Sequence, residues 1–461
     1  MPINSFENYP MSWKPILRPS KKPLYLALAE ELEQDIQTGK LLPGTKLPPQ
    51  RELADFLDIN VSTVTRAFKI CSNKGLLSSA VGSGTFVSYD VNTSTLIIPE
   101  ATALPHIELG SMMPETLPQK EAISLLQKML TEADCRHLFQ YGYREEYRHK
   151  EAAAQLFHKI GLTVTDPRLL LFANGGQNAL AAVFSGLLRP GDKIGVDPLI
   201  YPGVKGVAKL YGIQLVPIRQ KNREISEEGL VAAYKNDGIK GIYIMPDLQN
   251  PTNHTMTANC REMLAQKAKE LDLLIIEDGI NSLLYAQPLR PVVAMAPEHT
   301  VYILSLSKTI LPALRLAYLH TPVAYAQKLE NALYHINLSQ SSLLMELASR
   351  LIVSGKLEDI LEARRKGIVP RNRLVNEILH GYTALGGEEC LSRWLLLPEG
   401  ITGRELEQRA KQQGISLYGS ERFAVGKEPP EAAARLAICA PETLTELEQG
   451  LHSIKQILDA V

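Results

Sequence analysis

Short apolar runs recur through the middle of the chain, and they constrain its fold more than any other feature of the sequence. Most are separated by segments with helical spacing of apolar residues, such as Thr257–Leu271. Strands that alternate with helices form a mostly parallel sheet, with ligand chemistry at the carboxyl ends of the strands. The sequence therefore predicts a large α/β domain. The runs are LLLFA at 169, KIGVD at 193, IKGIYIM at 239, DLLIIED at 272, VYILSLS at 301 and LRLAYLH at 314.

Composition excludes several classes of protein. The chain has 461 residues, 45% hydrophobic and 21% charged, with a net charge of −1, which argues against disorder. Its five cysteines are far apart, so they predict neither a zinc site nor a disulfide framework and favour a reducing compartment. No run approaches the roughly 18 apolar residues of a membrane span, and the opening residues lack a signal-peptide pattern. We expect a cytoplasmic protein without a bound metal.

The first ninety residues have a different pattern. Apolar residues spaced by four predict a helix over Leu24–Thr38, and a proline-rich loop ends it. Shorter helices are predicted over Gln50–Leu57 and Val61–Lys74, with Val61, Val64, Phe68 and Cys71 facing inward in the second. Alternating residues around Gly82–Gly84 then predict two strands joined by a glycine turn. This order is that of a winged helix-turn-helix.

Such a module binds DNA when its last helix enters the major groove. That helix offers short polar groups and one cation in its first turn, and Arg51 begins the preceding helix, where termini meet phosphate. The wing glycines allow a close backbone approach to the sugar-phosphate edge. The alternative is a three-helix interaction domain whose polar residues are merely solvated. The DNA-binding candidates are Arg51, Asn60, Ser62, Thr63, Thr65, Arg66, Gly82 and Gly84.

The amino-acid sequence of this segment favours DNA binding. PGTKLPPQRELADFLDINVSTVTRAFKICSNKGLL followed by GSGTFV resembles the GntR-type DNA-binding domain over nearly its whole length. The resemblance implies that Arg51 and the polar residues Asn60, Ser62, Thr63 and Thr65 contact the operator. We therefore predict a double-stranded DNA partner.

A lysine that follows a buried strand is the main chemical signal of the larger domain. In SLSKTILPALRLAYL, Lys308 has the amine that condenses with an aldehyde, while Ser305, Ser307 and Arg315 suit a dianionic phosphate. These are the requirements of a pyridoxal 5′-phosphate site. Taken alone, the same residues fit a surface lysine in a serine-rich loop.

Further segments follow in the order that this chemistry requires. Gly175, Gly176 and Gln177 open a helix after a strand, which suits a phosphate, and Asp278 ends a strand, where a carboxylate would pair with the ring nitrogen. Singly, Asp278 also fits an N-cap, Tyr201 a core aromatic and Arg435 a surface ion pair. The remaining assignments are Tyr201 for stacking on the ring, Asn250 for the ring hydroxyl and Arg435 for a carboxylate.

From IELGSMMPETLP at 107 onward, the chain resembles fold-type-I aminotransferases. The resemblance implies a mostly parallel sheet with helices on both faces, a smaller C-terminal α+β lobe and a homodimer. It assigns Lys308 as the Schiff-base lysine, Asp278 to the ring nitrogen and Arg435 to an α-carboxylate. A GntR-type module ahead of such a domain is the arrangement of the MocR family of transcriptional regulators. The predicted parts are a DNA-binding domain at 13–88, a linker at 89–106 and an effector domain at 107–461.

The chain departs from the aminotransferase pattern on the substrate side. Ile280 stands where a tyrosine is usual, and Asn253 where glycine often follows NPT. In the approach loop that begins at Tyr141, a residue assigned to the effector, Glu146 replaces a glycine. We therefore expect a regulator that holds the cofactor without sustained turnover and senses an amine, an amino acid or the cofactor itself. The alternatives are an active aminotransferase with an added DNA-binding module, and a regulator that has lost the cofactor.

Overall fold

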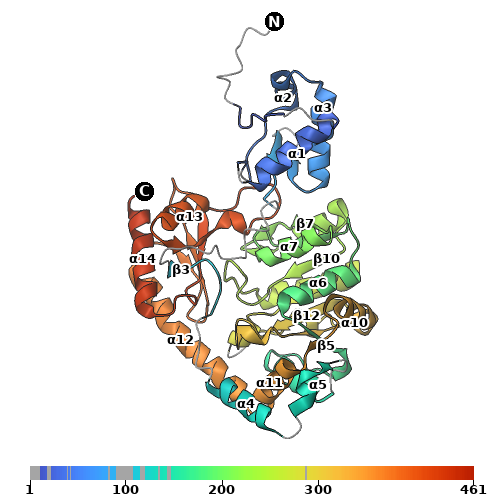
Figure 1. The fold of residues 1–461 in the computed structure, drawn as a ribbon, viewed down its shortest axis with the longest axis vertical. Coiled ribbons are helices and arrows are strands. Elements are labelled where there is room, and N and C mark those ends of the chain that lie inside the picture. Colours follow the sequence, from blue (N-terminus) through green and yellow to red (C-terminus); the bar gives the residue numbers. More distant parts are fainter. Residues whose placement is uncertain are drawn as a thin grey trace. The chain divides into compact units, whose positions relative to one another are not determined.

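A computed structural model describes residues 11–17, 22–38, 40–41, 43–80, 84–89, 107–114, 120–132, 135–142, 147–285 and 288–461. The chain forms two compact units, described separately below (Figure 1). One comprises residues 1–98 with 424–430, and the other comprises 99–423 with 431–461. Within the described residues, no helix combines the length and apolar character needed to cross a membrane. Most of the predicted linker, residues 90–106, lies outside the described residues.

The N-terminal unit has the predicted winged helix-turn-helix order. Its helices and strands are α1 Leu24–Gln37, α2 Gln50–Leu57, α3 Val61–Asn73, β1 Leu77–Ala80 and β2 Gly84–Val87. The two strands pair antiparallel. Leu32, Leu53 and Phe68 meet in the core. The inward assignment of Val61 was wrong: it is 38% exposed, because it is the first residue of α3 and the enclosed core begins one turn later, at Val64.

The larger unit is built on a seven-stranded sheet in the order β5-β13-β12-β11-β10-β6-β7. All neighbours pair parallel except β13, which is antiparallel to both β12 and β5. Six strands coincide with the predicted apolar runs, whereas β7 was not predicted because its half-buried residues alternate poorly with polar ones. The strands are β5 Leu170–Ala173, β6 Lys193–Val196, β7 Gln214–Pro217, β10 Gly241–Ile244, β11 Leu274–Asp278, β12 Thr300–Ser305 and β13 Ala317–His320.

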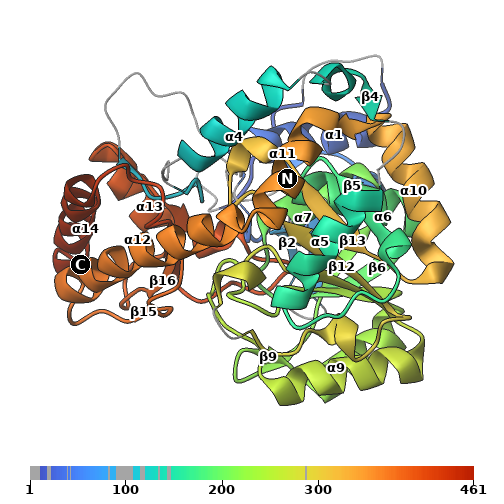
Figure 2. The same cartoon turned by 90° about the horizontal axis from the view of Figure 1, so that it is seen from below.

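Helices cover both faces of this sheet, as predicted (Figure 2). Tyr302 and Leu304 of β12 share a core with Phe157, and Ile275 of β11 shares one with Leu264. The helix after β5 packs against β5, β12 and β13. The helices of this layer are α4 Lys120–Thr131, α5 Tyr147–Lys159, α6 Gly176–Leu187, α7 Pro202–Leu210, α8 Glu227–Ala232, α9 Ala258–Leu271, α10 Val323–Asn337 and α11 Ser342–Val353.

The C-terminal part forms the predicted smaller α+β lobe. Its four-stranded sheet runs in the order β15-β16-β19-β18, and Leu395, Leu406 and Leu451 lie in its core. The short strand β3, Ile107–Glu108, pairs with β17, Ile415–Ser416, at this lobe. The other elements are α12 Lys356–Ile378, β15 Ala384–Leu385, β16 Arg393–Leu396, α13 Gly403–Gln412, β18 Tyr418–Gly419, β19 Ala433–Leu436 and α14 Leu444–Asp459.

Candidate functional site

Most of the predicted DNA-contacting residues are exposed polar side chains near the starts of α2 and α3, and they define a polar surface of the N-terminal unit. Val64 and Phe68 of α3 are buried, so the opposite side of that helix faces outward. Asn60, Ser62, Thr65 and Arg66 are exposed there, Thr63 is half-buried, and Arg51 is exposed in the first turn of α2. Gly82 lies outside the described residues. Short hydroxyl and amide groups with a guanidinium are the groups that read base edges and phosphates.

Two contacts orient this surface. The Thr65 hydroxyl donates to Gln50 Oε1 at 2.7 Å or to the Val61 carbonyl at 3.0 Å, so it fixes α2 against α3. The guanidinium of Arg66 lies 5.8 Å from the centre of the Tyr25 ring. Thr65 and Arg66 therefore have partners before any ligand arrives, while no ion pair to Arg51 is present within the described residues.

Lys46 is a candidate that the sequence prediction missed. It forms a bridge with Phe86 of the wing, and its side chain lies against Gly84, where a Cβ would be 3.0 Å from Lys46 Cε. Gly84 has a φ of +117°, a conformation that favours glycine. Lys46 lies in the proline-rich loop, where residues follow no helical or strand periodicity, so only the fold could place it beside the wing.

In the larger unit, the candidate residues lie where strands of the sheet end. The loop at Gly175 follows β5, Asp278 is the last residue of β11, and Ser305 is the last residue of β12. Because β5 and β12 are joined through β13, their ends lie close together, and a Cβ on Gly176 would be 3.5 Å from Ser305 Cβ. The sheet thus brings together residues that are far apart in the sequence.

One end of this cluster suits a phosphate. Arg315 Nη1 lies 3.4 Å from Ser307 Oγ, and Nη2 lies 3.5 Å from the Asn174 carbonyl. Gly175 has a φ of +89°, and a Cβ there would lie 2.6 Å from Arg315 Nη2. Only glycine therefore lets the loop lie against the guanidinium at the start of α6. Hydroxyls, a cation and a helix N-terminus together form an anion site.

Asp278 is buried, and it is not an N-cap. Its Oδ2 accepts a hydrogen bond from the Tyr243 hydroxyl at 2.8 Å, and its Oδ1 accepts from the Ile280 amide at 3.2 Å. Burial raises the pKa of the Asp278 carboxyl to about 6, and the two hydrogen bonds oppose that shift. Tyr243 is a partner that the sequence prediction missed, because nothing in the run IYIM distinguishes it from a core tyrosine.

Lys308 lies in a mostly buried position, and its Nζ donates to the Met112 carbonyl. Burial lowers the pKa of the Lys308 amine below its usual range; Cys439 opposes this shift, while Arg435 and Arg315 add to it. No carboxylate pairs with Lys308 in the described part of the chain. A neutral amine is the nucleophilic form of lysine.

Arg435 is buried and is not the surface ion pair considered above. Its Nη1 donates to Asn250 Oδ1 at 2.6 Å, and its Nη2 donates to the Gly110 carbonyl at 2.5 Å. The guanidinium also lies 4.8 Å from the Phe423 ring centre. Burial lowers the pKa of Arg435 to about 10, so the group stays charged at neutral pH. No carboxylate neutralises it within the described residues, which leaves it able to bind one.

Tyr201 and Gln177 are neighbours at the start of α7, because a Cβ on Gly203 would lie 2.3 Å from Tyr201 Cε1 and 2.4 Å from Gln177 Oε1. Asp278, Arg435 and Arg315 all act electrostatically on Tyr201, whose pKa burial raises to about 12. Gln177 Nε2 donates to the Gly203 carbonyl at 2.8 Å, whereas its buried Oε1 has no partner in the described structure. Tyr141 is 66% exposed in β4, Tyr141–Gly142, which pairs with β14, Gln340–Ser341, and the structure does not bring it to the cluster.

The departures from the aminotransferase pattern have structural consequences. Ile280 offers only its amide to Asp278, and Asn253 Nδ2 donates to the Ser392 carbonyl at 2.8 Å. Asn253 thereby links the loop after β10 to the smaller lobe. Glu146 lies outside the described residues.

Comparisons with known proteins agree with both units. The aminotransferase class I and II family matches residues 106–454, and the gntR family of bacterial regulatory proteins matches residues 24–87. The uncharacterised HTH-type transcriptional regulator YdeF of Bacillus subtilis is 48% identical over 100% of this chain and 99% of its own. PdxR of Corynebacterium glutamicum, an HTH-type pyridoxine biosynthesis transcriptional regulator, is 24% identical over 76% of this chain and 78% of its own.

Solved aminotransferase structures share the fold of the larger unit. An archaeal alanine:glyoxylate aminotransferase matches with a TM-score of 0.71 at 18% identity, covering 84% of this chain and 98% of that one. The kynurenine aminotransferase of Pyrococcus horikoshii matches with a TM-score of 0.69 at 22% identity, covering 77% and 92%. Membership of the aminotransferase class I and II family implies binding of pyridoxal phosphate. With a gntR-type module ahead of an aminotransferase class I and II domain, the chain belongs to the MocR family of transcriptional regulators.

Proposed function

We propose that the larger unit holds pyridoxal 5′-phosphate and senses an amino compound, or the cofactor itself, to control operator binding by the N-terminal unit. The observation that carries this proposal is the placement of Lys308. It is a mostly buried amine whose pKa is lowered, and Arg435 and Arg315 lie near enough to add to that shift. A structural lysine would instead be exposed or paired with a carboxylate.

The residues present fit the cofactor. Arg315, Ser305, Ser307 and the start of α6 after Gly175 would bind the phosphate, and the cradle exists because a Cβ on Gly175 would overlap Arg315. Asp278 would pair with the ring nitrogen, Tyr201 would stack on the ring and Asn250 would meet the ring hydroxyl. Gln177 Oε1 is a buried acceptor still without a partner, as expected beside a ligand. When bound, the cofactor would supply an aldehyde to the Lys308 amine.

The chain's own residues suggest how a ligand would be sensed. Lys308 and Arg435 donate to the Met112 and Gly110 carbonyls, so one short segment contacts both groups. A ligand that offers a carboxylate to Arg435 would compete with the Gly110 carbonyl. That segment follows directly on residues 89–106, the expected linker, so its release would bias the arrangement of the DNA-binding unit. A ligand has this effect only through different affinities for the two arrangements.

A homodimer is part of the proposal. The resemblance to fold-type-I enzymes implies sites built between two copies, and the exposed Tyr141 is consistent with a site completed by a second chain. Two winged modules would then read paired half-sites. The name of the relative PdxR favours the cofactor as one ligand of this domain. The aminotransferase neighbours favour the alternative of an active enzyme, although at under 25% identity they carry the fold alone.

The visible absorption spectrum of the purified protein tests the proposal. We expect a band that Lys308→Ala abolishes and Lys328→Ala, a matched change on the exposed face of α10, leaves intact. Both variants should still bind DNA from the region flanking the protein's own gene. A protein that stays colourless after addition of pyridoxal phosphate would contradict the cofactor assignment. Sustained conversion of an amino acid with a keto acid would establish the enzymatic alternative.

A further inference from the structure

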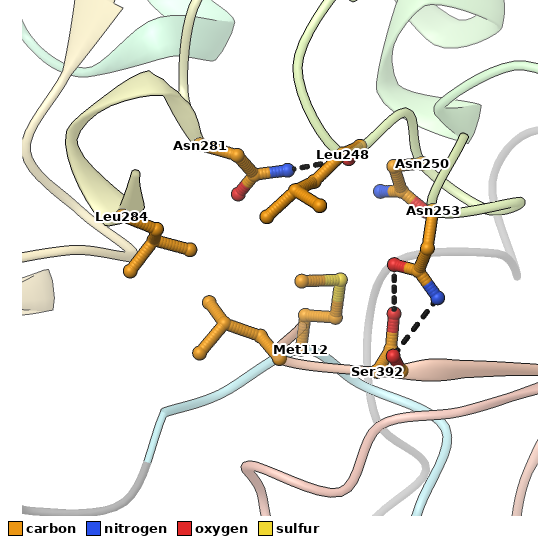
Figure 3. A pocket seen from close by; sticks show the side chains of 8 residues that line it. Met112, Leu248, Asn250, Asn253, Asn281, Leu284 and Ser392 are labelled. Atoms are coloured by element: carbon orange, nitrogen blue, oxygen red, sulfur yellow. Dashed lines mark hydrogen bonds between the residues drawn. The ribbon is translucent and has the colours of Figure 1, made fainter. Parts of the chain in front are cut away.

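A small pocket adjoins the cofactor cluster and has no role in the function proposed so far (Figure 3). It lies where the loop after β10, the turn after β11 and the smaller lobe meet, within the larger unit. The residues that line it are Met112, Leu248, Asn250, Asn253, Asn281, Leu284, Leu391 and Ser392. Two of them, Met112 and Asn250, are the partners of Lys308 and Arg435, so the pocket adjoins the proposed ligand site.

One polar atom of this pocket lacks a partner. Asn281 is 4% exposed, and its Nδ2 donates to the Leu248 carbonyl at 2.8 Å. Its Oδ1 is buried and accepts no hydrogen bond in the described structure. Figure 3 shows that oxygen turned toward the pocket on the side of Leu284. An unsatisfied buried acceptor is costly, and a ligand that donates a hydrogen bond to it would remove the cost.

The remaining lining excludes a charged group. None of the described residues that line the pocket is charged. The other amide oxygens are already used, because Asn250 accepts from Arg435 and Asn253 accepts from Ser392 at 3.2 Å. A carboxylate placed here would face the Asn281 oxygen without a cation and would lose its hydration. A methyl group would leave that oxygen unsatisfied.

The pocket is closed by Met112. It has no room for a water molecule as it stands, and the Met112 side chain projects into it (Figure 3). A thioether on three rotatable bonds moves at little cost. A ligand that drew the Met112 carbonyl away from Lys308 would also withdraw this side chain.

We propose that this pocket receives the side chain of the effector, and that it selects an uncharged group with an O–H or N–H donor for Asn281. The effector is then an amino compound with a hydroxyl or amide side chain, such as an amino acid that carries a side-chain hydroxyl or carboxamide. This inference rests on the proposed function, because it requires the amine and carboxylate of that compound at Lys308 and Arg435.

Isosteric ligand pairs test the selection on the full-length protein loaded with pyridoxal phosphate. Serine differs from 2-aminobutyrate, and homoserine from norvaline, only by a hydroxyl in place of a methyl group. Dissociation constants are read from the shift of the visible band and from thermal stabilisation. We expect the hydroxyl member to bind about tenfold more tightly than its partner, and glutamine to bind more tightly than glutamate.

Two variants locate the selectivity. Asn281→Leu should reduce the hydroxyl preference to about one while the Lys308-dependent band remains. Met112→Ala, which leaves Asn281 intact, should admit homoserine several-fold more tightly and keep the preference. Equal binding of both members of each pair, or a preference that survives Asn281→Leu, would overturn the inference and leave the sensing function standing. If no amino compound shifts the band of the loaded protein, amino-compound sensing and this inference both fail.

Discussion

The two units of the molecule place their functional side chains in opposite environments. In the winged helix-turn-helix, Arg51, Ser62 and Arg66 are exposed and come from a stretch of sixteen consecutive residues, 51–66. In the aminotransferase-like unit, Asp278 and Arg435 are 5% and 4% exposed and lie 157 residues apart. The first site lies on the surface, and its side chains are not part of the hydrophobic core. The second site is buried, so the position of each side chain depends on its neighbours and on the fold.

We expect the largest difference between the two units from glycine substitutions. Gly175→Ala places a Cβ 2.6 Å from Arg315 Nη2, in a backbone conformation that costs a side chain about 1–3 kcal/mol. We expect cofactor affinity to fall by about a hundredfold and the melting temperature of this unit to fall. Gly84→Ala is the counterpart in the wing. Its φ of +117° carries a similar backbone cost, and its Cβ would meet the flexible end of Lys46 at 3.0 Å. We expect DNA binding to weaken several-fold with little loss of cofactor, because the cofactor residues lie in the other unit.

Calorimetry and absorption titration measure both effects. Gly206→Ala in α7 is the control, because nothing lies within 4 Å of the added Cβ there. Equal losses of cofactor in Gly175→Ala and Gly206→Ala would mean that the loop after β5 does not hold the phosphate.

Removal of an exposed positive charge from the first unit should affect DNA binding and leave cofactor binding unchanged. Arg51→Ala and Arg66→Ala should each weaken operator binding by about tenfold, because a phosphate or base contact of this kind contributes about 1–3 kcal/mol. In a plot of the logarithm of operator affinity against the logarithm of salt concentration, the slope should become shallower by about one if the lost contact is to phosphate. Cofactor affinity should not change. Lys209→Ala, on α7 of the other unit, is the control for the loss of one positive charge.

An unchanged operator affinity in both arginine variants would favour the interaction-domain alternative for this unit. A loss of cofactor in either would contradict the division of labour between the units.

The same contrast explains what the sequence can predict. The helices of the first unit follow from local periodicity, because each buries one face. Six strands of the large sheet follow from short apolar runs, because helices cover both faces of that sheet. The exposure of Val61 depends on where the core begins, which no local pattern records. In the second unit, Lys308, Asp278 and Arg435 could be named from their segments. Their partners, the Met112 and Gly110 carbonyls and the Tyr243 hydroxyl, come from segments with no chemical signal, and only the fold brings them together.

The smallest predicted effect concerns a single hydrogen bond inside the buried site. Burial raises the pKa of Asp278 to about 6, and the Tyr243 hydroxyl opposes that rise. An ionised Asp278 is the form that pairs with a protonated ring nitrogen, so cofactor affinity should fall as the pH drops through about 6. Tyr243→Phe removes the opposing hydrogen bond, so the carboxyl should protonate at higher pH. The midpoint should therefore move upward by about one unit.

Titration of cofactor binding between pH 5 and 8 separates this effect from a packing defect. At pH 8, Asp278 is ionised in both proteins, so Tyr243→Phe should bind the cofactor within a few-fold of the parent. A uniform loss at every pH would mean that Tyr243 acts through packing in β10 alone. Tyr318→Phe is the matched control, because Tyr318 is also a buried tyrosine of the same sheet and makes no contact with Asp278. A midpoint that moves only in Tyr243→Phe would establish that the buried site, unlike the DNA-binding surface, is tuned by residues that no ligand touches.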